Sequence, residues 1–279
     1  MPSSISRISK SASSWLDVVR RTTRSPDEAE FEIREIEEAL AAQHGQRQAP
    51  FFVRQNRKVI LLAFAIAAFN QLSGINAILY YAPDIFRSAG AGDNAAALES
   101  VIIGLVNLIV TMAALTVIDK IGRRKLMLIG SIGYLVSLGV LAGVFFAYEG
   151  QFSGFSSVLV LGGLVVFIAA HAFGQGSVIW VFISEIFPNR IRGRGQSLGS
   201  LTHWVFAAVV SAIFPAIASA LGGGMAFTLF FLCMVGQLIW VLKVMPETRG
   251  VPLEEMERNL GIELSEEDIS GAESGPRGH

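Results

Sequence analysis

The stretch from Asn70 to Pro83, N-Q-L-S-G-I-N-A-I-L-Y-Y-A-P, places amides and hydroxyls at the end of a long apolar run. No charged residue occurs from Val59 to Pro83. A helix needs roughly 20 apolar residues to cross the hydrocarbon core of a bilayer, and this run is long enough. The stretch therefore predicts a transmembrane helix with polar side chains inside the membrane, where such groups are costly and mark candidate functional sites.

Four further charge-free stretches follow, and each is long enough to span a bilayer: Ser100–Ile118, Leu126–Tyr148, Gly150–Ser184 and Gly195–Leu242. The last has room for two spans, and three consecutive glycines from Gly222 to Gly224 predict a break within it. Only 16% of the 279 residues are charged, against about a quarter in soluble domains. We therefore predict an all-α integral membrane protein with six transmembrane helices, rather than a soluble protein with buried helices.

Basic residues fall on alternate connectors between the predicted spans. On one side the connectors contain Arg57, the segment DKIGRRK from Asp119 to Lys125, Arg192 and Arg249, whereas the other side has only Arg87. Lys and Arg concentrate in cytoplasmic loops, so this pattern predicts that both termini are cytoplasmic. We expect a multi-pass protein of the plasma (inner) membrane.

The charge pattern divides the chain into four regions. They are a loose Ser- and Arg-rich N-terminus, a cytoplasmic linker with a short helix, a six-helix transmembrane bundle, and an acidic cytoplasmic tail that is disordered at its end: residues 1–24, 25–57, 58–246 and 247–279. Ser25 and Pro26 are typical of a helix start. This linker helix either lies under the bundle or is a solvated connection.

The polar residues of the opening stretch suit a neutral ligand that is rich in hydroxyl groups. Ser73, Asn76 and Tyr80 share one helical stripe, whereas Gln71 points away from it on a regular helix. A turn loosened at Ser73–Gly74 would bring Gln71 and Asn76 to one cavity. Amides donate and accept hydrogen bonds, which suits a sugar better than an ion. Hydrogen bonding between helices explains the same residues equally well.

Several classes of function lack support in the sequence. A net charge of -1 gives no indication of a nucleic-acid partner. The single cysteine, Cys233, excludes a disulfide within the chain. We find neither a Ser/His/Asp array nor metal-ligand spacing, so we predict no enzyme activity, no catalytic residues, no metal and no cofactor.

Five motifs together resemble the sugar porters of the major facilitator superfamily. QLSGIN with YYAP is similar to the seventh helix of that family, and the others match its cytoplasmic loops: DKIGRR from Asp119, SEIFP from Ser184 with Arg192–Gly193, PETRG from Pro246, and the linker segment 26–45. The order and spacing of the motifs fit, and the resemblance covers roughly residues 25–255.

The resemblance implies a twelve-helix fold in two six-helix halves, of which this chain matches the linker and the second half. It implies transport of a monosaccharide across the bilayer by alternating access, with a separate N-terminal half or a second copy of the chain as partner. Proton coupling stays open, because the coupling carboxylate of proton-driven members lies in the first half. The alternative is a truncated fragment that does not transport, or a membrane module that binds a sugar or a partner.

The resemblance also assigns candidate residues. Those expected to bind sugar are Gln71, Asn76, Asn107, Trp180 and His203, with Asn70 replacing a family glutamine and Trp204 following His203. Those expected to gate the outer side are Tyr80 and Tyr81, and those expected to gate the cytoplasmic side are Asp119, Arg123, Arg124, Glu185, Arg192 and Glu247. Packing explains the aromatic residues, and orientation in the membrane explains the arginines, without any such role.

Overall fold

The computed structural model describes residue 34 and residues 50–90, 92–148 and 151–262. The chain divides into two units, Met1–Pro50 and Phe51–His279, and all helices discussed below belong to the second. The predicted loose N-terminus, most of the linker helix and the acidic tail beyond Ile262 lie outside the described residues.

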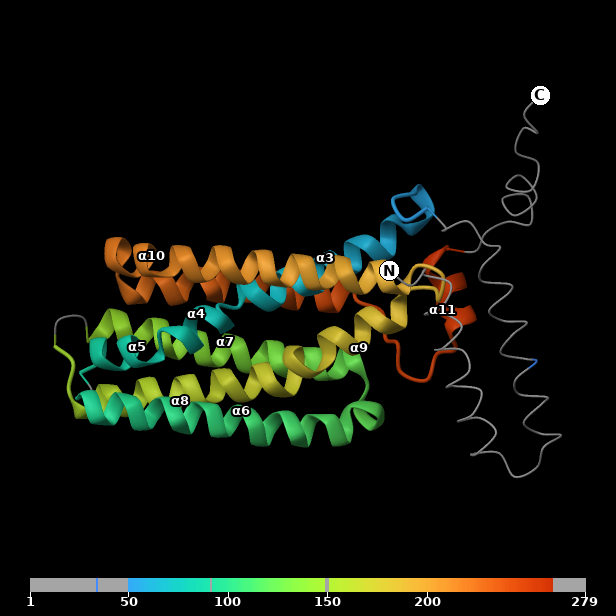
Figure 1. Ribbon diagram of the computed structural model, residues 1–279. Coiled ribbons are helices and arrows are strands. Elements are labelled where there is room, and N and C mark those ends of the chain that lie inside the picture. Colours follow the sequence, from blue (N-terminus) through green and yellow to red (C-terminus); the bar gives the residue numbers. More distant parts are fainter. Residues whose placement is uncertain (1–33, 35–49, 91, 149–150, 263–279) are drawn as a thin grey trace, which may run out of the picture. The chain divides into compact units, whose positions relative to one another are not determined.

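Within the described residues the second unit is entirely helical (Figure 1). Its elements are, in chain order, η1 (Arg54–Asn56), α3 (Arg57–Leu72), α4 (Ile75–Tyr80), α5 (Ala82–Ser88), α6 (Asp93–Ile121), α7 (Arg123–Ala147), α8 (Gly154–His171), η2 (Ala172–Gly176), α9 (Ser177–Ile186), α10 (Arg192–Lys243) and α11 (Leu253–Leu260). The helix α11 was not anticipated from the sequence.

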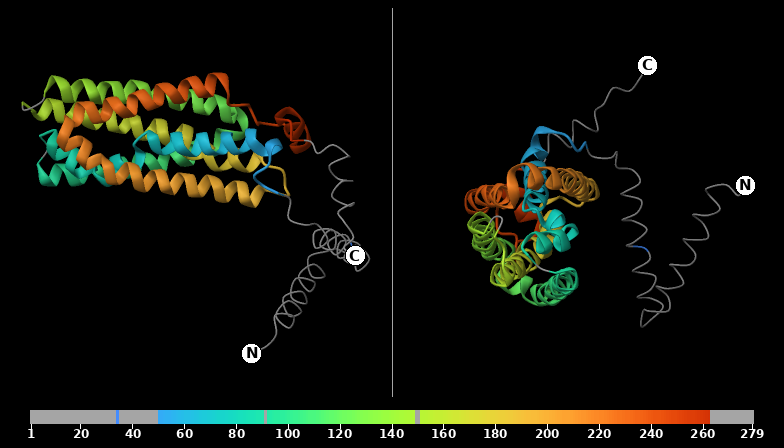
Figure 2. Two further views of the ribbon diagram at one scale, coloured as in Figure 1. Left: turned by 90° about the horizontal axis from the view of Figure 1, so that it is seen from above. Right: turned by 90° about the vertical axis from the view of Figure 1, so that its left-hand side faces the viewer.

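Five of the described helical stretches are long and apolar enough to cross a membrane: Arg54–Tyr80, Ala97–Ile121, Arg123–Ala147, Gly154–Ile186 and Arg192–Lys243. The sequence predicts six spans, and the difference arises because the last two run into one another through α10. Gly222 inside α10 has non-helical angles, φ 81° and ψ 160°. The chain reverses direction there, so α10 consists of two rods, and the second runs back toward the end of the bundle where the first begins (Figure 2).

The helix α7 packs extensively against α8 and α10. Its buried Tyr134 and Leu138 belong to one apolar cluster with Phe167 of α8 and Phe227 of α10. The outward faces of α6 and α10 are different, because they expose many large apolar side chains, among them Leu105, Leu108, Ile109, Leu201 and Val205. A bundle with a packed interior and an apolar exterior suits a lipid environment.

Two glycines let α7 approach η2 with their backbones in contact. A Cβ added at Gly130 would lie 2.9 Å from the carbonyl oxygen of Ala170 and 2.9 Å from Cα of Gly174. Small residues at such crossings allow close helix packing in membranes. Because the obstructing atoms belong to the backbone, they cannot move aside as a flexible side chain would.

We expect Gly130→Ala to lower the stability of the bundle, because the added methyl group overpacks this crossing at a cost of about 1–3 kcal/mol. The matched control is Gly143→Ala on the same helix, where a Cβ meets no atom within 4 Å. Thermal unfolding of the purified protein, followed by size-exclusion chromatography after heating, measures the difference. Equal melting temperatures for the two variants would contradict the close crossing.

Candidate functional site

The helix that carries the opening stretch is broken between α3 and α4. Gly74 has φ 86°, and the hydroxyl of Ser73 donates to the Asn70 carbonyl at 2.6 Å. The same Ser73 oxygen accepts the backbone N–H of Ile75 at 3.3 Å. A Cβ at Gly74 would lie 2.5 Å from the ring of Phe230. Both the conformation and the space therefore require glycine, and the loosened turn that Ser73–Gly74 predicts is present.

The break brings the amides of this stretch together. Asn76 Nδ2 donates to Gln71 Oε1 at 3.0 Å, and Gln71 Nε2 donates to Asn70 Oδ1 at 2.9 Å. Gln71 Nε2 also lies 3.2 Å from both ring nitrogens of His203 on α10. Three amides and one imidazole thus form a continuous polar network that joins α3, α4 and α10.

This network lines a cavity of about 240 Å³ among α3, α4, α6, α8, η2 and α10. Its lining residues are Asn70, Gln71, Ile75, Asn76, Leu79, Asn107, Thr111, His171, Ala172, Gly176 and His203. The cavity is slightly smaller than the roughly 300–1,000 Å³ of sites for drug-sized ligands, which suits a small polar molecule. Five of the residues that the family resemblance assigns to sugar binding meet here: Asn70, Gln71, Asn76, Asn107 and His203.

The two candidate tryptophans do not line the cavity. Trp180 on α9 and Trp204 on α10 both pack against His203, with ring centroids 5.2 Å and 5.1 Å away. Their side chains are 37% and 60% exposed. They border the imidazole from outside the cavity and restrict how it can turn.

Two lining residues with polar side chains, Thr111 and His171, were not assigned to sugar binding from the sequence. Thr111 lies one turn beyond Asn107 on α6, so the helical period alone could have indicated it. His171 is held by the hydroxyl of the buried Tyr134, 2.5 Å from its Nδ1. No pattern in the sequence indicates this contact between α7 and α8.

The π-helical turn η2 forms one wall of the cavity through Ala172 and Gly176. Its Gln175 is fully buried, and neither of its amide atoms has a hydrogen-bond partner among the described residues. A π-helical turn inserts one extra residue into a helix and is frequent at functional sites.

The two candidate tyrosines of the outer gate lie at the end of α4. The ring of Tyr81 packs on Phe214 of α10 at 5.6 Å, whereas Tyr80 is exposed. The structure thus places them differently: Tyr81 closes against a neighbouring helix, and Tyr80 faces outward.

At the other end of the bundle, Arg123 is the centre of a charged cluster. Its Nη2 lies 2.6 Å from Glu185 Oε1 and 2.9 Å from Asp119 Oδ1, and its Nε donates to Glu185 Oε2 at 3.0 Å. The side chains of Arg123 and Glu185 are 8% and 28% exposed. The hydroxyl of Thr248 donates to Glu185 at 2.6 Å, which ties the segment after α10 to α9.

Glu247 caps the N-terminus of α7. Its carboxylate accepts the backbone N–H groups of Arg123 at 2.9 Å and Arg124 at 3.2 Å. The first N–H groups of a helix have no partner within it and carry partial positive charge, so a carboxylate is favourable there. A Cβ at Gly122, which has φ 98°, would lie 2.6 Å from Glu247 Oε2. The DKIGRR and PETRG segments therefore meet through a helix cap.

The remaining two charged candidates make different contacts. Arg124 reaches the C-terminal end of α10, where its guanidinium donates to the carbonyls of Val241 at 3.2 Å and Leu242 at 2.6 Å. Arg192 donates through Nε to the Phe187 carbonyl at 3.4 Å. The described contact of Arg192 is therefore with the backbone after α9 and not with the ion pairs around Arg123.

Comparison with known proteins places the motifs in a transporter family. A family model described as "Sugar (and other) transporter" matches residues 5–260. The "Probable metabolite transport protein CsbC" of Bacillus subtilis is 33% identical over 243 residues, which cover 87% of this chain and 52% of that protein. The "Arabinose-proton symporter" of the same species is 34% identical over 230 residues, which cover 82% of this chain and 48% of that protein. The chain thus spans about half the length of the curated relatives it matches.

Solved structures also match most of this chain and about half of their own length. The proton:xylose symporter XylE bound to 6-bromo-6-deoxy-D-glucose aligns with a TM-score of 0.66 and 31% identity, over 85% of this chain and 50% of that one. An inward open conformation of the xylose transporter XylE from E. coli aligns with a TM-score of 0.67 and 30% identity, over 87% and 48%. The resemblance drawn from the motifs is confirmed, and this chain belongs to the sugar transporter family of the major facilitator superfamily, a family of membrane transporters rather than enzymes.

Proposed function

We propose that this chain acts as the C-terminal half of a sugar porter and moves a monosaccharide across the membrane by alternating access. The observation that carries the proposal is the network of Asn70, Gln71, Asn76 and His203 along a cavity of about 240 Å³. The names of two relatives, an arabinose–proton and a D-xylose–proton symporter, support a monosaccharide as the substrate class.

The proposed topology has six spans, with both termini in the cytoplasm of a plasma membrane. The break at Gly222 supports the count, because it divides the 52-residue helix α10 into two rods that run back past each other. The alternation of basic connectors supports the orientation. The Arg123 cluster then lies on the cytoplasmic side, and Tyr80 and Tyr81 lie on the outer side.

The polar side chains of the cavity suit a neutral sugar, because they can bind its hydroxyl groups without any ionised partner. Each sugar hydroxyl donates and accepts hydrogen bonds, as each Asn and Gln amide does. The amides of Gln71 and Asn76 bond to each other, and the hydroxyls of a sugar could replace that bond with bonds of the same kind. Asn107 lies on a different helix, α6, and would contact the ligand from another side.

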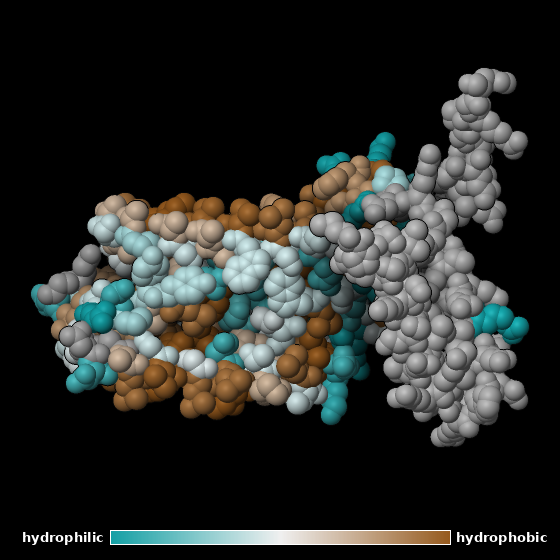
Figure 3. Space-filling view, in the orientation of Figure 1, coloured by the Kyte–Doolittle hydropathy of each residue, from teal (hydrophilic) through white to brown (hydrophobic). Residues whose placement is uncertain are grey.

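The cavity is open on one side of the bundle. Figure 3 shows paler, more polar residues in the middle of this face, between hydrophobic edges at α10 and α6. A polar face is costly in contact with lipid, so it needs a cover. A separate N-terminal half or a second copy of the chain would supply that cover and the opposite wall of the site.

The charged cluster would act as the cytoplasmic gate of the cavity. Arg123 joins Glu185 and Asp119, and Glu247 joins the start of α7 to the segment after α10. Opening this side would separate the elements that these contacts join, and closing it would restore them. The packing of Tyr81 on Phe214 is the corresponding contact proposed for the outer side.

Proton coupling is not assigned to this half. The names of two relatives include a proton as the coupled ion. The residues described as lining the cavity include His171 and His203 but no carboxylate.

The alternative function is a membrane module that binds a sugar without moving it. The open side of the cavity favours this alternative, because alternating access needs two walls that move against each other. Binding and uptake measured on the same preparation separate the two functions.

We expect Asn76→Ala to weaken sugar binding by about 10- to 100-fold, because it leaves a sugar hydroxyl without its amide partner in the cavity at a cost of about 1–3 kcal/mol. Binding of labelled D-xylose and D-glucose to the purified full chain measures this effect. Asn189→Ala, at an exposed position outside the cavity, is the matched control and should leave binding unchanged.

Uptake into proteoliposomes tests the transport step with the same variants. Uptake of either sugar that Asn76→Ala abolishes and Asn189→Ala does not would support a transporter. Binding without uptake, from protein that is folded and inserted, would support the binding module instead. Equal sugar binding by both variants would reject the proposed site.

We expect Glu185→Gln to destabilise the protein by about 1–3 kcal/mol, because it leaves the buried guanidinium of Arg123 without its strongest partner. The control is Asp84→Asn, which removes the exposed ion pair with Arg87 at 2.8 Å and should cost about 0–1 kcal/mol. Thermal unfolding of both variants measures the difference. A role in gating further predicts that Glu185→Gln changes the uptake rate while sugar affinity stays the same, and a loss of affinity would contradict that role.

A further inference from the structure

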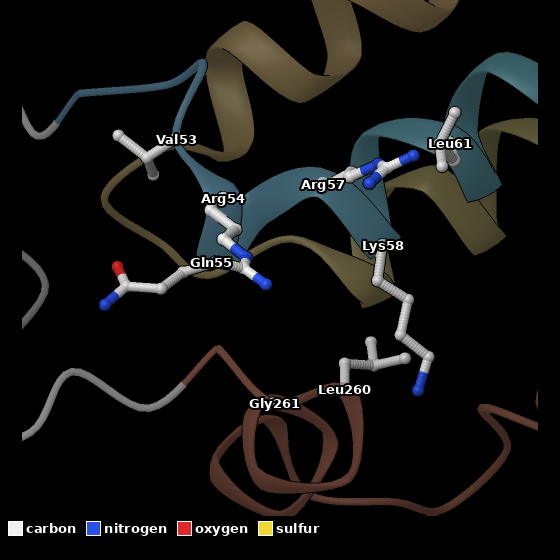
Figure 4. Close-up of a pocket in the computed structure, with 8 residues that line it drawn as sticks. All are labelled: Val53, Arg54, Gln55, Arg57, Lys58, Leu61, Leu260 and Gly261. Carbon is white, nitrogen blue, oxygen red and sulfur yellow. The ribbon is translucent and has the colours of Figure 1, made fainter.

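A second and larger pocket lies at the end of the bundle where α3 begins. It has a volume of about 840 Å³ and is lined by Val53, Arg54, Gln55, Arg57, Lys58, Leu61, Leu260 and Gly261 (Figure 4). None of these residues lines the cavity around Gln71, so the two sites are separate. The sequence motifs and the proposed transport function leave this pocket unexplained.

The pocket is positively charged on its α3 side. Arg54, Arg57 and Lys58 line it, and all three side chains are exposed. No Asp or Glu occurs among the residues that line it. Lys58 Nζ donates to the Asn259 carbonyl at 3.3 Å, which links the start of α3 to the last turn of α11. This arrangement attracts an anion, and the planar guanidinium groups of two arginines suit the oxygens of a phosphate.

The other walls of the pocket are apolar and continue into the membrane-spanning part of α3. Leu61 and Leu260 line the pocket, and Leu61 is 53% exposed. Phe64, which is 44% exposed, lies three residues further along α3. Arg57, Leu61 and Phe64 share one helical stripe, because they are four and then three residues apart. A charged group held at Arg57 would therefore have an apolar strip directly beside it.

We propose that this pocket binds the headgroup of an anionic phospholipid, with its phosphate between Arg54, Arg57 and Lys58 and an acyl chain along Leu61 and Phe64. Clusters of basic residues at the end of a membrane span attract anionic lipids. The charge-free stretch begins at Val59, directly after Lys58, which puts the cations at headgroup depth. Free phosphate would use the cations alone, whereas a lipid uses both the cations and the apolar strip. With the orientation proposed above, the lipid belongs to the cytoplasmic leaflet.

The acidic segment after α11 is the competing occupant. Its carboxylates follow closely after Gly261 in the sequence: Glu263, Glu266, Glu267 and Asp268. They lie outside the described residues, and their charge is also complementary to the three cations. A tail that fills the pocket would exclude the lipid, so the experiment must separate the two.

The test is native mass spectrometry of the purified full chain, titrated with phosphatidylglycerol and, separately, with phosphatidylcholine. The wild type should bind a first phosphatidylglycerol more tightly than phosphatidylcholine. The triple variant Arg54→Gln, Arg57→Gln, Lys58→Gln should weaken the first phosphatidylglycerol by at least about tenfold, because each cation near a headgroup contributes severalfold. Inorganic phosphate at millimolar concentration should not displace the lipid, because it gains nothing from the apolar strip.

The matched control removes three exposed cations from the same end of the bundle: Lys120→Gln, Lys125→Gln, Lys243→Gln. It should leave the first phosphatidylglycerol unchanged. Equal weakening in both triple variants would mean that only diffuse charge attracts the lipid, and displacement by inorganic phosphate would mean that the site binds the free anion. Either result overturns the proposal. Binding that appears only after the four tail carboxylates are neutralised would assign the pocket to the tail and overturn it as well.

Discussion

A buried amide needs a hydrogen-bond partner, and this requirement organises the centre of the molecule around Gln71. Its amide contacts Asn70 within α3, Asn76 across the break into α4, and His203 on α10. In an apolar interior each unmet polar group costs several kcal/mol, roughly the size of one well-packed side chain. The network therefore sets where three helical segments meet, and the same groups that join them are available to a ligand. The atoms that join the helices are thus the same atoms that would recognise the proposed sugar.

Much of this arrangement can be read from the sequence, because membrane burial leaves a simple pattern. The charge-free stretches identify the helices, and the amides inside them identify the cavity wall. The break at Ser73–Gly74 is also predictable, since both residues favour turns. The structure differs from the sequence prediction where contacts between distant segments determine the position of a side chain. It places Trp180 and Trp204 beside His203 rather than on the cavity.

The cap that Glu247 forms on α7 shows why the contacts between distant segments could not be predicted from the sequence. Glu247 and Arg123 both belong to recognisable motifs. Neither motif indicates that the Glu247 carboxylate accepts a hydrogen bond from the backbone N–H of Arg123. That contact depends on how the segment after α10 returns across the bundle. The same applies to Arg192, which lies among charged neighbours and bonds to the Phe187 carbonyl. The charge of a residue indicates on which side of the membrane it lies. Its hydrogen-bond or ion-pair partner depends on the path of the chain, which the charge does not indicate.

The close approach of the Phe230 ring to Gly74 has a consequence for which substitutions this chain can tolerate. A side chain at position 74 would collide with that ring and would also need a left-handed backbone conformation. A smaller residue at position 230 removes the first obstacle but leaves the second. Position 230 can therefore accept a smaller side chain while position 74 stays glycine. Position 74 remains strained with any other residue, whichever side chain stands at position 230. The bend that shapes the cavity around Gln71 is thus protected by backbone geometry, whereas no such backbone constraint acts on Gln71 and Asn76 beside it.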